Sequence, residues 1–207
     1  NLGVDSTSRA SLIRDLQNSQ QSYIGEDGNM SIHSSLTIVS QELTVLLGYG
    51  DIQLLTTLID WYDSDKNPWI HKTIQGGSRE ISGVWVNLLG ATTTELLCSA
   101  LPMEAIGGGF VARVIFIYSP KREKKVANQF PSLEELELGN KLVKDLGDIG
   151  LLGGQFKITP ECLEYYIDWY NNYEEEEECK DERFFGYFNR KPTTIKKLSM
   201  IISASSS

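Results

Sequence analysis

Basic residues are scarce in this chain. Its 207 residues include 19 Lys and Arg against 28 Asp and Glu, which gives a net charge of −9. This balance excludes a protein that is basic over its whole surface and binds nucleic acid through it, although a local basic element remains compatible with it. Only three cysteines occur, far apart in the sequence: Cys98, Cys162 and Cys179. They match neither a disulfide framework nor a zinc pattern and suit a reducing compartment, so we expect a cytoplasmic protein.

Several other signals are missing. No stretch of roughly 18 apolar residues is present, so we expect no membrane-spanning segment, and no basic-then-apolar leader is visible. His33 and His71 stand alone without the spacing of metal ligands, so no metal site is predicted. The phosphate-binding motif Gly-x-x-x-x-Gly-Lys-Ser/Thr is absent from the sequence. The glycine cluster at 107–109 does not replace it, because it lacks the lysine and precedes a predicted strand rather than a helix.

The hydrophobic pattern predicts strands that alternate with helices, and hence an α/β core. The predicted strands cover residues 35–40, 84–89, 110–118 and 155–158, and a hairpin joins the runs 69–74 and 80–86 around a Gly-Gly turn. The predicted helices cover residues 8–20, 43–47, 52–62, 94–101, 131–148, 160–178 and 193–203. Residues 21–34 are polar and are expected to form a loop. We therefore expect a core in residues 1–120 and a helical subdomain in 121–207.

The predicted strand 35–40 is followed directly by Gln41 and Glu42. An acid in this position lies at the carboxyl edge of the sheet, where α/β proteins bind ligands. In nucleotide hydrolases, the first of two adjacent acids there orients magnesium and the second polarises the attacking water. Glu42 fits the second role, whereas the neutral Gln41 weakens the first. The alternative is that Glu42 only caps the helix that follows.

Thr92, Thr93 and Thr94 follow the next predicted strand, and Arg113 interrupts the apolar run 110–118. The threonines cap a helix or, alternatively, present a hydroxyl to a γ-phosphate or to the attacking water. Arg113 needs an anionic partner, because an unpaired buried guanidinium costs several kcal/mol. That partner is either a phosphate, as for an arginine finger, or an internal acid such as Glu104.

Two further basic pairs are candidates for phosphate contacts. Lys72 and Arg79 flank the tip of the predicted hairpin, where a basic ribbon suits a nucleic-acid backbone. Lys196 and Lys197 fall in the first turns of the predicted helix 193–203, whereas ordinary charge placement favours the last turn of a helix. In both cases the alternative is a solvated, charged surface.

The order of these features resembles the ATPase core of primase–helicase-type proteins of phages and bacteria, including a family found in mobile elements, and distantly the minichromosome maintenance helicases. Residues 36–43 resemble the Walker B strand, and residues 69–86 resemble the hairpin before sensor 1. Residues 87–93 resemble the sensor 1 strand. Residues 109–116 resemble the arginine-finger segment, and residues 194–198 resemble the sensor 2 helix of the lid. The resemblance implies a partial RecA/AAA-like P-loop fold with a β-hairpin and a C-terminal helical lid.

The resemblance also implies ATP and Mg²⁺ as cofactors, DNA as a partner and a homo-oligomeric ring. Glu42 then activates water, Thr92 senses the γ-phosphate and Arg113 completes the site of a neighbouring subunit. Gln41 occupies the magnesium position, and Lys196 or Lys197 contacts phosphate from the lid. The pair formed by Lys72 and Arg79 touches DNA.

Two departures from the family pattern leave alternatives open. Gln41 replaces the usual Asp, and the Walker A loop is missing. We therefore expect either a piece of a longer ATPase or a remodelled form that does not hydrolyse nucleotide. The second form would be an adaptor that binds protein or DNA. A third possibility is an unrelated α/β protein in which the threonines and Arg113 serve only as caps and ion pairs.

Overall fold

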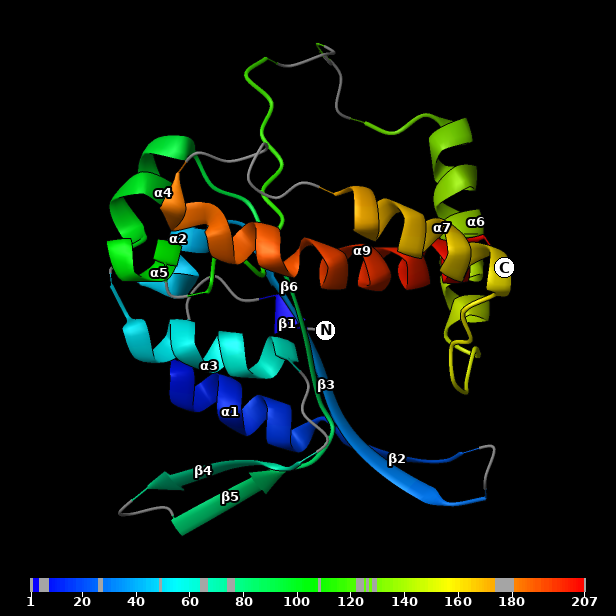
Figure 1. Ribbon diagram of the computed structural model, residues 1–207, viewed down its shortest axis with the longest axis horizontal. Coiled ribbons are helices and arrows are strands. Elements are labelled where there is room, and N and C mark those ends of the chain that lie inside the picture. The colour runs from blue at the N-terminus through cyan, green and yellow to red at the C-terminus, as the bar shows by residue number, and fades with distance from the viewer. Residues whose placement is uncertain are drawn as a thin grey trace. The chain divides into compact units, whose positions relative to one another are not determined.

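A computed structural model describes residues 2–3, 8–25, 28–48, 50–63, 67–73, 77–107, 109–121, 125, 127, 130–173 and 181–206. The chain divides into two compact units, residues 1–114 with 179–188 and residues 115–178 with 189–207. Figure 1 shows the elements of each unit. No helix in the described ranges is both long and apolar enough to cross a bilayer.

The first unit has a mixed α/β structure. Its elements are β1 (Leu2–Gly3), α1 (Arg9–Asn18), β2 (Gln20–Ile24), β3 (Met30–Ser40), α2 (Leu43–Leu47), α3 (Ile52–Asp63), β4 (Trp69–Thr73), β5 (Gly77–Ile81), β6 (Val84–Gly90), α4 (Thr94–Ala100), α5 (Met103–Gly107) and η1 (Glu182–Phe184). The second unit contains α6 (Leu133–Ile149), α7 (Pro160–Asn172) and most of α9 (Phe185–Ser205). The α/β class predicted from the sequence is therefore confirmed, with helices towards the C-terminus.

β3 is the centre of the main sheet. It pairs in parallel with β6, from Ser34 opposite Val84 to Ser40 opposite Gly90. β2 pairs antiparallel with the first half of β3, and because Ser34 is also opposite Gln20, β2 and β6 lie on opposite edges of β3. β1 pairs in parallel with the second half of β3. β4 and β5 form a separate two-stranded hairpin, but the predicted second arm, residues 80–86, is divided between the end of β5 and the start of β6.

One face of the sheet carries the core. Alternate residues of β3 are buried, and α1 and α3 contact this part of the molecule (Figure 1). The main buried apolar side chains are Leu12, Ile13, Leu16, Leu36, Ile38, Leu46, Leu47, Leu54, Trp61, Ile81 and Phe110. The other face is open, since Trp85 and Leu89 of β6 are 56% and 67% exposed. β6 also has no strand on its second edge within the described residues.

Residues 21–34 are not the loop that their polarity suggests. They form β2 and the first part of β3, joined as an antiparallel hairpin with Ile24 opposite Met30. Every residue of β2 is exposed. A strand with no buried face shows no alternation of apolar and polar residues, which is why the sequence pattern missed it.

The strand predicted at 110–118 is also absent. The Arg113 N–H donates to the Phe110 carbonyl at 3.0 Å, so the segment begins as a turn. Residues 110–112 are buried, whereas residues 115–118 are exposed and pair with no strand among the described residues. β-propensity alone does not form a strand, because its backbone groups need a neighbour. Residues 155–158 likewise form no strand.

The last helix begins earlier than predicted. α9 starts at Phe185 and continues through Pro192. Proline is most common in the first turn of a helix, whereas Pro192 lies well inside α9. Here the helix accepts Pro192 in its interior and loses one backbone hydrogen bond there. By contrast α7 ends at Asn172, and the end predicted for it at residue 178 lies outside the described residues.

The second unit has little buried surface of its own. α6 begins with a capping box, in which the Ser132 hydroxyl accepts from the Glu135 N–H at 3.2 Å and the Glu135 carboxylate accepts from the Ser132 N–H at 2.7 Å. Leu138, Leu142 and Leu146 follow one turn apart, and each is more than half exposed. No described residue after Ala112 is buried.

Gly83 connects the hairpin to the sheet, and we predict that it tolerates no side chain. Its φ is +56°, and a Cβ atom there would lie 2.6 Å from the Ile32 carbonyl oxygen. Gly83→Ala should therefore lower the free energy of unfolding by about 1–3 kcal/mol, measured by urea denaturation. Gly107→Ala is the control, because a Cβ atom at Gly107 meets nothing within 4 Å. Equal stabilities of the two variants would contradict this account of the junction.

Candidate functional site at the ends of β3 and β6

The ends of the two parallel strands are joined beyond their last paired residues. The Ala91 N–H donates to the Ser40 carbonyl at 3.2 Å, and the Leu43 N–H donates to the Ala91 carbonyl at 2.8 Å. Gly90 permits this close approach, because a Cβ atom there would lie 2.9 Å from the Leu43 side chain. The segment that carries Glu42 and the segment that carries Thr92 are therefore held side by side at the carboxyl edge of the sheet.

Glu42 is fixed at this edge by its neighbours in the chain. The buried Ser40 hydroxyl donates to the Glu42 carbonyl at 3.0 Å. The Glu42 carboxylate accepts from the Thr44 N–H at 3.2 Å and from the Thr44 hydroxyl at 2.8 Å. Glu42 is thus the N-cap of the short helix α2. The structure confirms the capping role that the sequence offered as an alternative. The hydrogen bonds of the cap fix the orientation of the Glu42 carboxylate.

Thr92 lies next to this carboxylate. Its hydroxyl is the largest cause that lowers the pKa of Glu42 below the ordinary value of 4.5, followed by the Thr44 hydroxyl. Thr93, rather than Thr92, caps α4, since its hydroxyl accepts from the Leu96 N–H at 3.3 Å. The Thr92 hydroxyl makes only a long contact of 3.5 Å to the Thr93 carbonyl. The Thr92 hydroxyl therefore does not cap α4 and acts instead on the pKa of Glu42.

The lowered pKa has two consequences. At neutral pH the Glu42 carboxyl is ionised, as an ordinary glutamate is, and its lower pKa makes it a weaker base than an ordinary glutamate. Because its folded-state pKa lies below the ordinary value, the stability that it contributes is present above about pH 4.5 and is lost as the pH falls through the folded-state pKa.

The resemblance implies that ATP and Mg²⁺ bind, but this chain provides only some of the residues that such a site needs. Gln41 is exposed and brings no carboxylate. Within the described residues no three His, Cys, Asp or Glu side chains come together as metal ligands would. The residues present fit the activation of water, but they do not fit a metal ion or a triphosphate held by this chain alone.

Arg113 is engaged elsewhere in the first unit. Its guanidinium forms an ion pair with Asp63 at the end of α3, with Nη2 2.6 Å from Oδ2 and Nε 3.3 Å from Oδ1. Nη1 also donates to the Gly109 carbonyl at 2.9 Å. The Arg113 side chain is only 9% exposed. The structure therefore gives Arg113 an internal acid as its partner, as one alternative from the sequence holds, although the acid is Asp63 and not Glu104.

Lys196 and Lys197 belong to the second unit and lie in the interior of α9, not in its first turns. The expectation that they sit at a helix start is wrong, because α9 begins at Phe185. The Lys196 ammonium lies 4.4 Å from the centre of the Tyr166 ring, a cation–π distance. Lys197 is half-buried.

Lys72 and Arg79 do not share a face of the hairpin. His71 is directly opposite Arg79, whereas Lys72 is opposite Ser78. Successive side chains of a strand point to opposite faces, so Arg79 lies with His71 on one face and Lys72 on the other. The Arg79 face also holds the buried Ile81 and therefore turns towards the body of the unit.

Sequence reasoning missed two residues of the site, Ser40 and Thr44. Both hydroxyls act on Glu42, one on its carbonyl and one on its carboxylate. The signal for them was the pattern Ser-x-Glu-x-Thr after a buried strand, in which short hydroxyl side chains hydrogen-bond to nearby groups.

No protein-family model matches this sequence, and neither a curated protein nor a solved structure is significantly similar to it. The site is therefore described by its own geometry.

We predict that Thr92→Val raises the pKa of Glu42 towards 4.5, because it removes the hydroxyl that lowers this pKa most. NMR titration of the carboxyl carbons measures the change. Thr94→Val is the matched control, since the Thr94 hydroxyl acts on Glu95 and should raise the pKa of that residue instead. An unchanged Glu42 titration in Thr92→Val would show that the two side chains do not interact.

Proposed function

We propose that this chain supplies the water-activating part of a nucleotide-hydrolysing ATPase of the RecA/AAA-like, primase–helicase type that acts on DNA. The observation that carries the proposal is the pairing of Glu42 with Thr92. These residues come from segments about fifty positions apart, and the parallel strands β3 and β6 bring them to one edge of the sheet.

The chemistry of the pair suits hydrolysis. An ionised carboxylate beside a hydroxyl can hold one water molecule, with the hydroxyl fixing its orientation and the carboxylate accepting its proton. Ser40 and Thr44 keep the carboxylate in place, and Gly90 keeps the two segments close. In this proposal Glu42 is the general base and Thr92 holds the water.

The unpaired edge of β6 is evidence that the sheet extends further in the complete protein. Its second edge has no partner within the described residues, and its sequence Val-Trp-Val-Asn-Leu-Leu-Gly carries no charge and no proline. Natural edge strands usually carry such features, which discourage further pairing. Parallel strands are also usually covered on both faces, whereas Trp85 and Leu89 are exposed here. We propose that a further strand pairs with this edge and carries the phosphate-binding loop that these 207 residues lack.

The remaining roles follow from the resemblance and stay proposals. Arg113 would complete the site of a neighbouring subunit, which requires it to leave Asp63. Lys196 or Lys197 would contact phosphate from the helical lid. The exposed apolar stripe of α6 supports assembly with other copies, and we propose a homo-oligomeric ring.

We predict that Glu42→Gln abolishes hydrolysis without abolishing nucleotide binding. The amide keeps the size of the side chain and most of its hydrogen bonds but cannot accept a proton from water. In the complete gene product that contains these residues, kcat for DNA-stimulated ATP hydrolysis should fall about 100-fold or more.

Glu104→Gln is the control, because Glu104 lies exposed on α5 and carries the same change of charge. It should hydrolyse ATP at the wild-type rate. Wild-type hydrolysis in Glu42→Gln, with nucleotide bound as before, would remove Glu42 from the role of base.

A non-catalytic adaptor is the second candidate function. Gln41 in place of an acid and the missing phosphate loop favour it, and the capping of α2 gives Glu42 a structural task in either case. A wild-type protein that binds no ATP by calorimetry but binds DNA or another protein would establish the adaptor and exclude the ATPase.

A further inference from the structure

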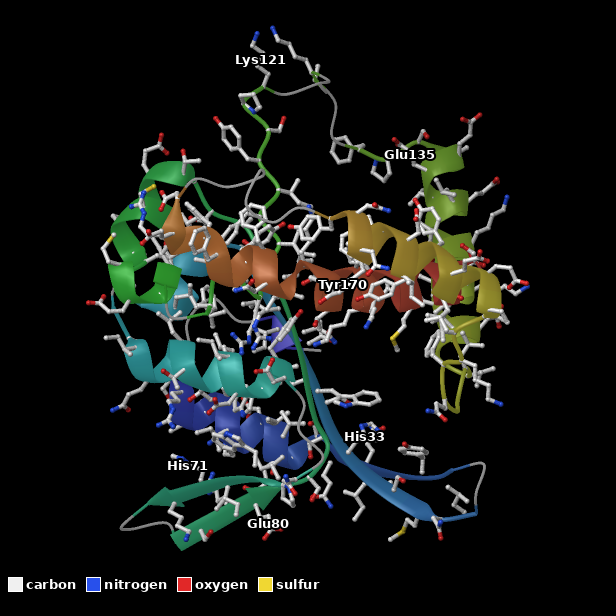
Figure 2. The ribbon with its side chains drawn as sticks, viewed as in Figure 1. His33, His71, Glu80, Lys121, Glu135 and Tyr170 are labelled. Atoms are coloured by element: carbon white, nitrogen blue, oxygen red, sulfur yellow. The ribbon has the colours of Figure 1, made fainter. Side chains whose placement is uncertain are left out.

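A pocket lies between the start of α1 and the hairpin formed by β4 and β5. Its volume is about 400 Å³. It is lined by Ser8, Ala10, Ser11, Ile13, Arg14, His71 and Arg79. All of these residues belong to the first unit, and none of them belongs to the site at Glu42. Figure 2 labels His71 on β4 and Glu80 on β5, and the strand alternation places the Glu80 side chain on the opposite face from Arg79.

The lining is positively charged and contains no acidic residue. Arg14 donates to the Ser11 hydroxyl at 3.2 Å and lies 3.6 Å from the Asp15 carboxylate, so its charge is partly balanced. The Arg79 guanidinium has no hydrogen bond and no ion pair to any residue that the structure describes. It is nevertheless only partly exposed. A guanidinium held in this way lacks the anion that it would normally contact.

The surroundings of His71 show the same excess of positive charge. Burial lowers the pKa of His71, and the charges of Arg9 and Arg79 lower it further. Arg9 is held close by the Thr57 hydroxyl at 2.7 Å. The imidazole ring stacks on Trp69, with 5.6 Å between the ring centres and 6° between the planes. His71 is thus a neutral side chain at neutral pH that can donate one hydrogen bond into the pocket.

We propose that this pocket binds a phosphate group. Arg79 supplies a two-pronged donor that matches two phosphate oxygens, and Arg14 adds a second positive charge. The hydroxyls of Ser8 and Ser11 and the imidazole of His71 line the remaining wall. The N-terminus of α1, a helix of ten residues, adds its partial positive charge on the same side.

The phosphate comes either from a nucleic-acid backbone or from a free nucleotide. The proposal refines the DNA-binding part of the function proposed above, because it assigns the contact to Arg79 and its face of the hairpin and not to Lys72. It does not depend on hydrolysis, and a failure of Glu42 as a base would leave it standing.

The chain offers a direct experiment, because it contains two histidines and only His71 lines the pocket. NMR spectra of the histidine rings would be recorded while the protein is titrated with inorganic phosphate, with ATP and with a single-stranded oligodeoxynucleotide. We expect the His71 signals to shift and saturate while those of His33 stay in place. Tighter binding of the oligonucleotide than of ATP would identify a nucleic-acid phosphate, and the reverse would identify a nucleotide.

Arg79→Gln and Lys72→Gln form a matched pair on the same hairpin. Arg79→Gln should weaken phosphate binding about tenfold or more, whereas Lys72→Gln should change it less than about twofold. Arg79→Lys should recover part of the affinity, which separates charge from folding, and Glu104→Gln, which lies outside the pocket on α5, should bind as the wild type does. No shift of His71 with any of the three ligands, or equal losses in Arg79→Gln and Lys72→Gln, would overturn the proposal.

Discussion

The parallel pairing of β3 with β6 is the constraint on which the rest of the structure depends. It places alternate residues of β3 in the core, where α1 packs against β3 and α3 against β6. It also continues beyond the strands, through the bonds from Ala91 to Ser40 and from Leu43 to Ala91. Because this continuation sets the distance between two loops, it decides whether Glu42 and Thr92 form one site. Parallel pairing thereby brings residues that are distant in the sequence close together at one edge of the sheet.

The two sites proposed for this molecule differ in whether their charged side chains have partners within the chain. At Glu42 a carboxylate is surrounded by hydroxyl donors, which keep it ionised and oriented. At the hairpin, several positive groups converge without an acid in the lining, and the pKa of His71 is lowered first by burial and then by the charges of Arg9 and Arg79. The hydrogen bonds of the first arrangement are supplied within the chain. The second leaves a guanidinium without a partner among the described residues and suits an anionic ligand.

Elements with a local signal could be predicted from the sequence. Ser8 and Thr93 are capping residues that predict the starts of α1 and α4, and the run of apolar residues before Glu42 predicts the second half of β3. Glu42 and Thr92 could be predicted as neighbours because both follow strands of one parallel sheet. The predictions that failed concern features that depend on a neighbouring strand or on the register of strand pairing. The exposed β2 has no alternation, residues 115–118 lack a strand to pair with, and only the register of the hairpin separates Lys72 from Arg79.

The most direct test of the central claim is a measurement of scalar couplings across the hydrogen bonds at the strand ends, in protein labelled with ¹⁵N and ¹³C. The account predicts a coupling from the Ala91 amide nitrogen to the Ser40 carbonyl carbon and another from the Leu43 amide nitrogen to the Ala91 carbonyl carbon. Their presence would show that Glu42 and Thr92 are held in one site. Their absence, with the β3–β6 couplings intact, would mean that the two loops separate and that the proposed site does not form.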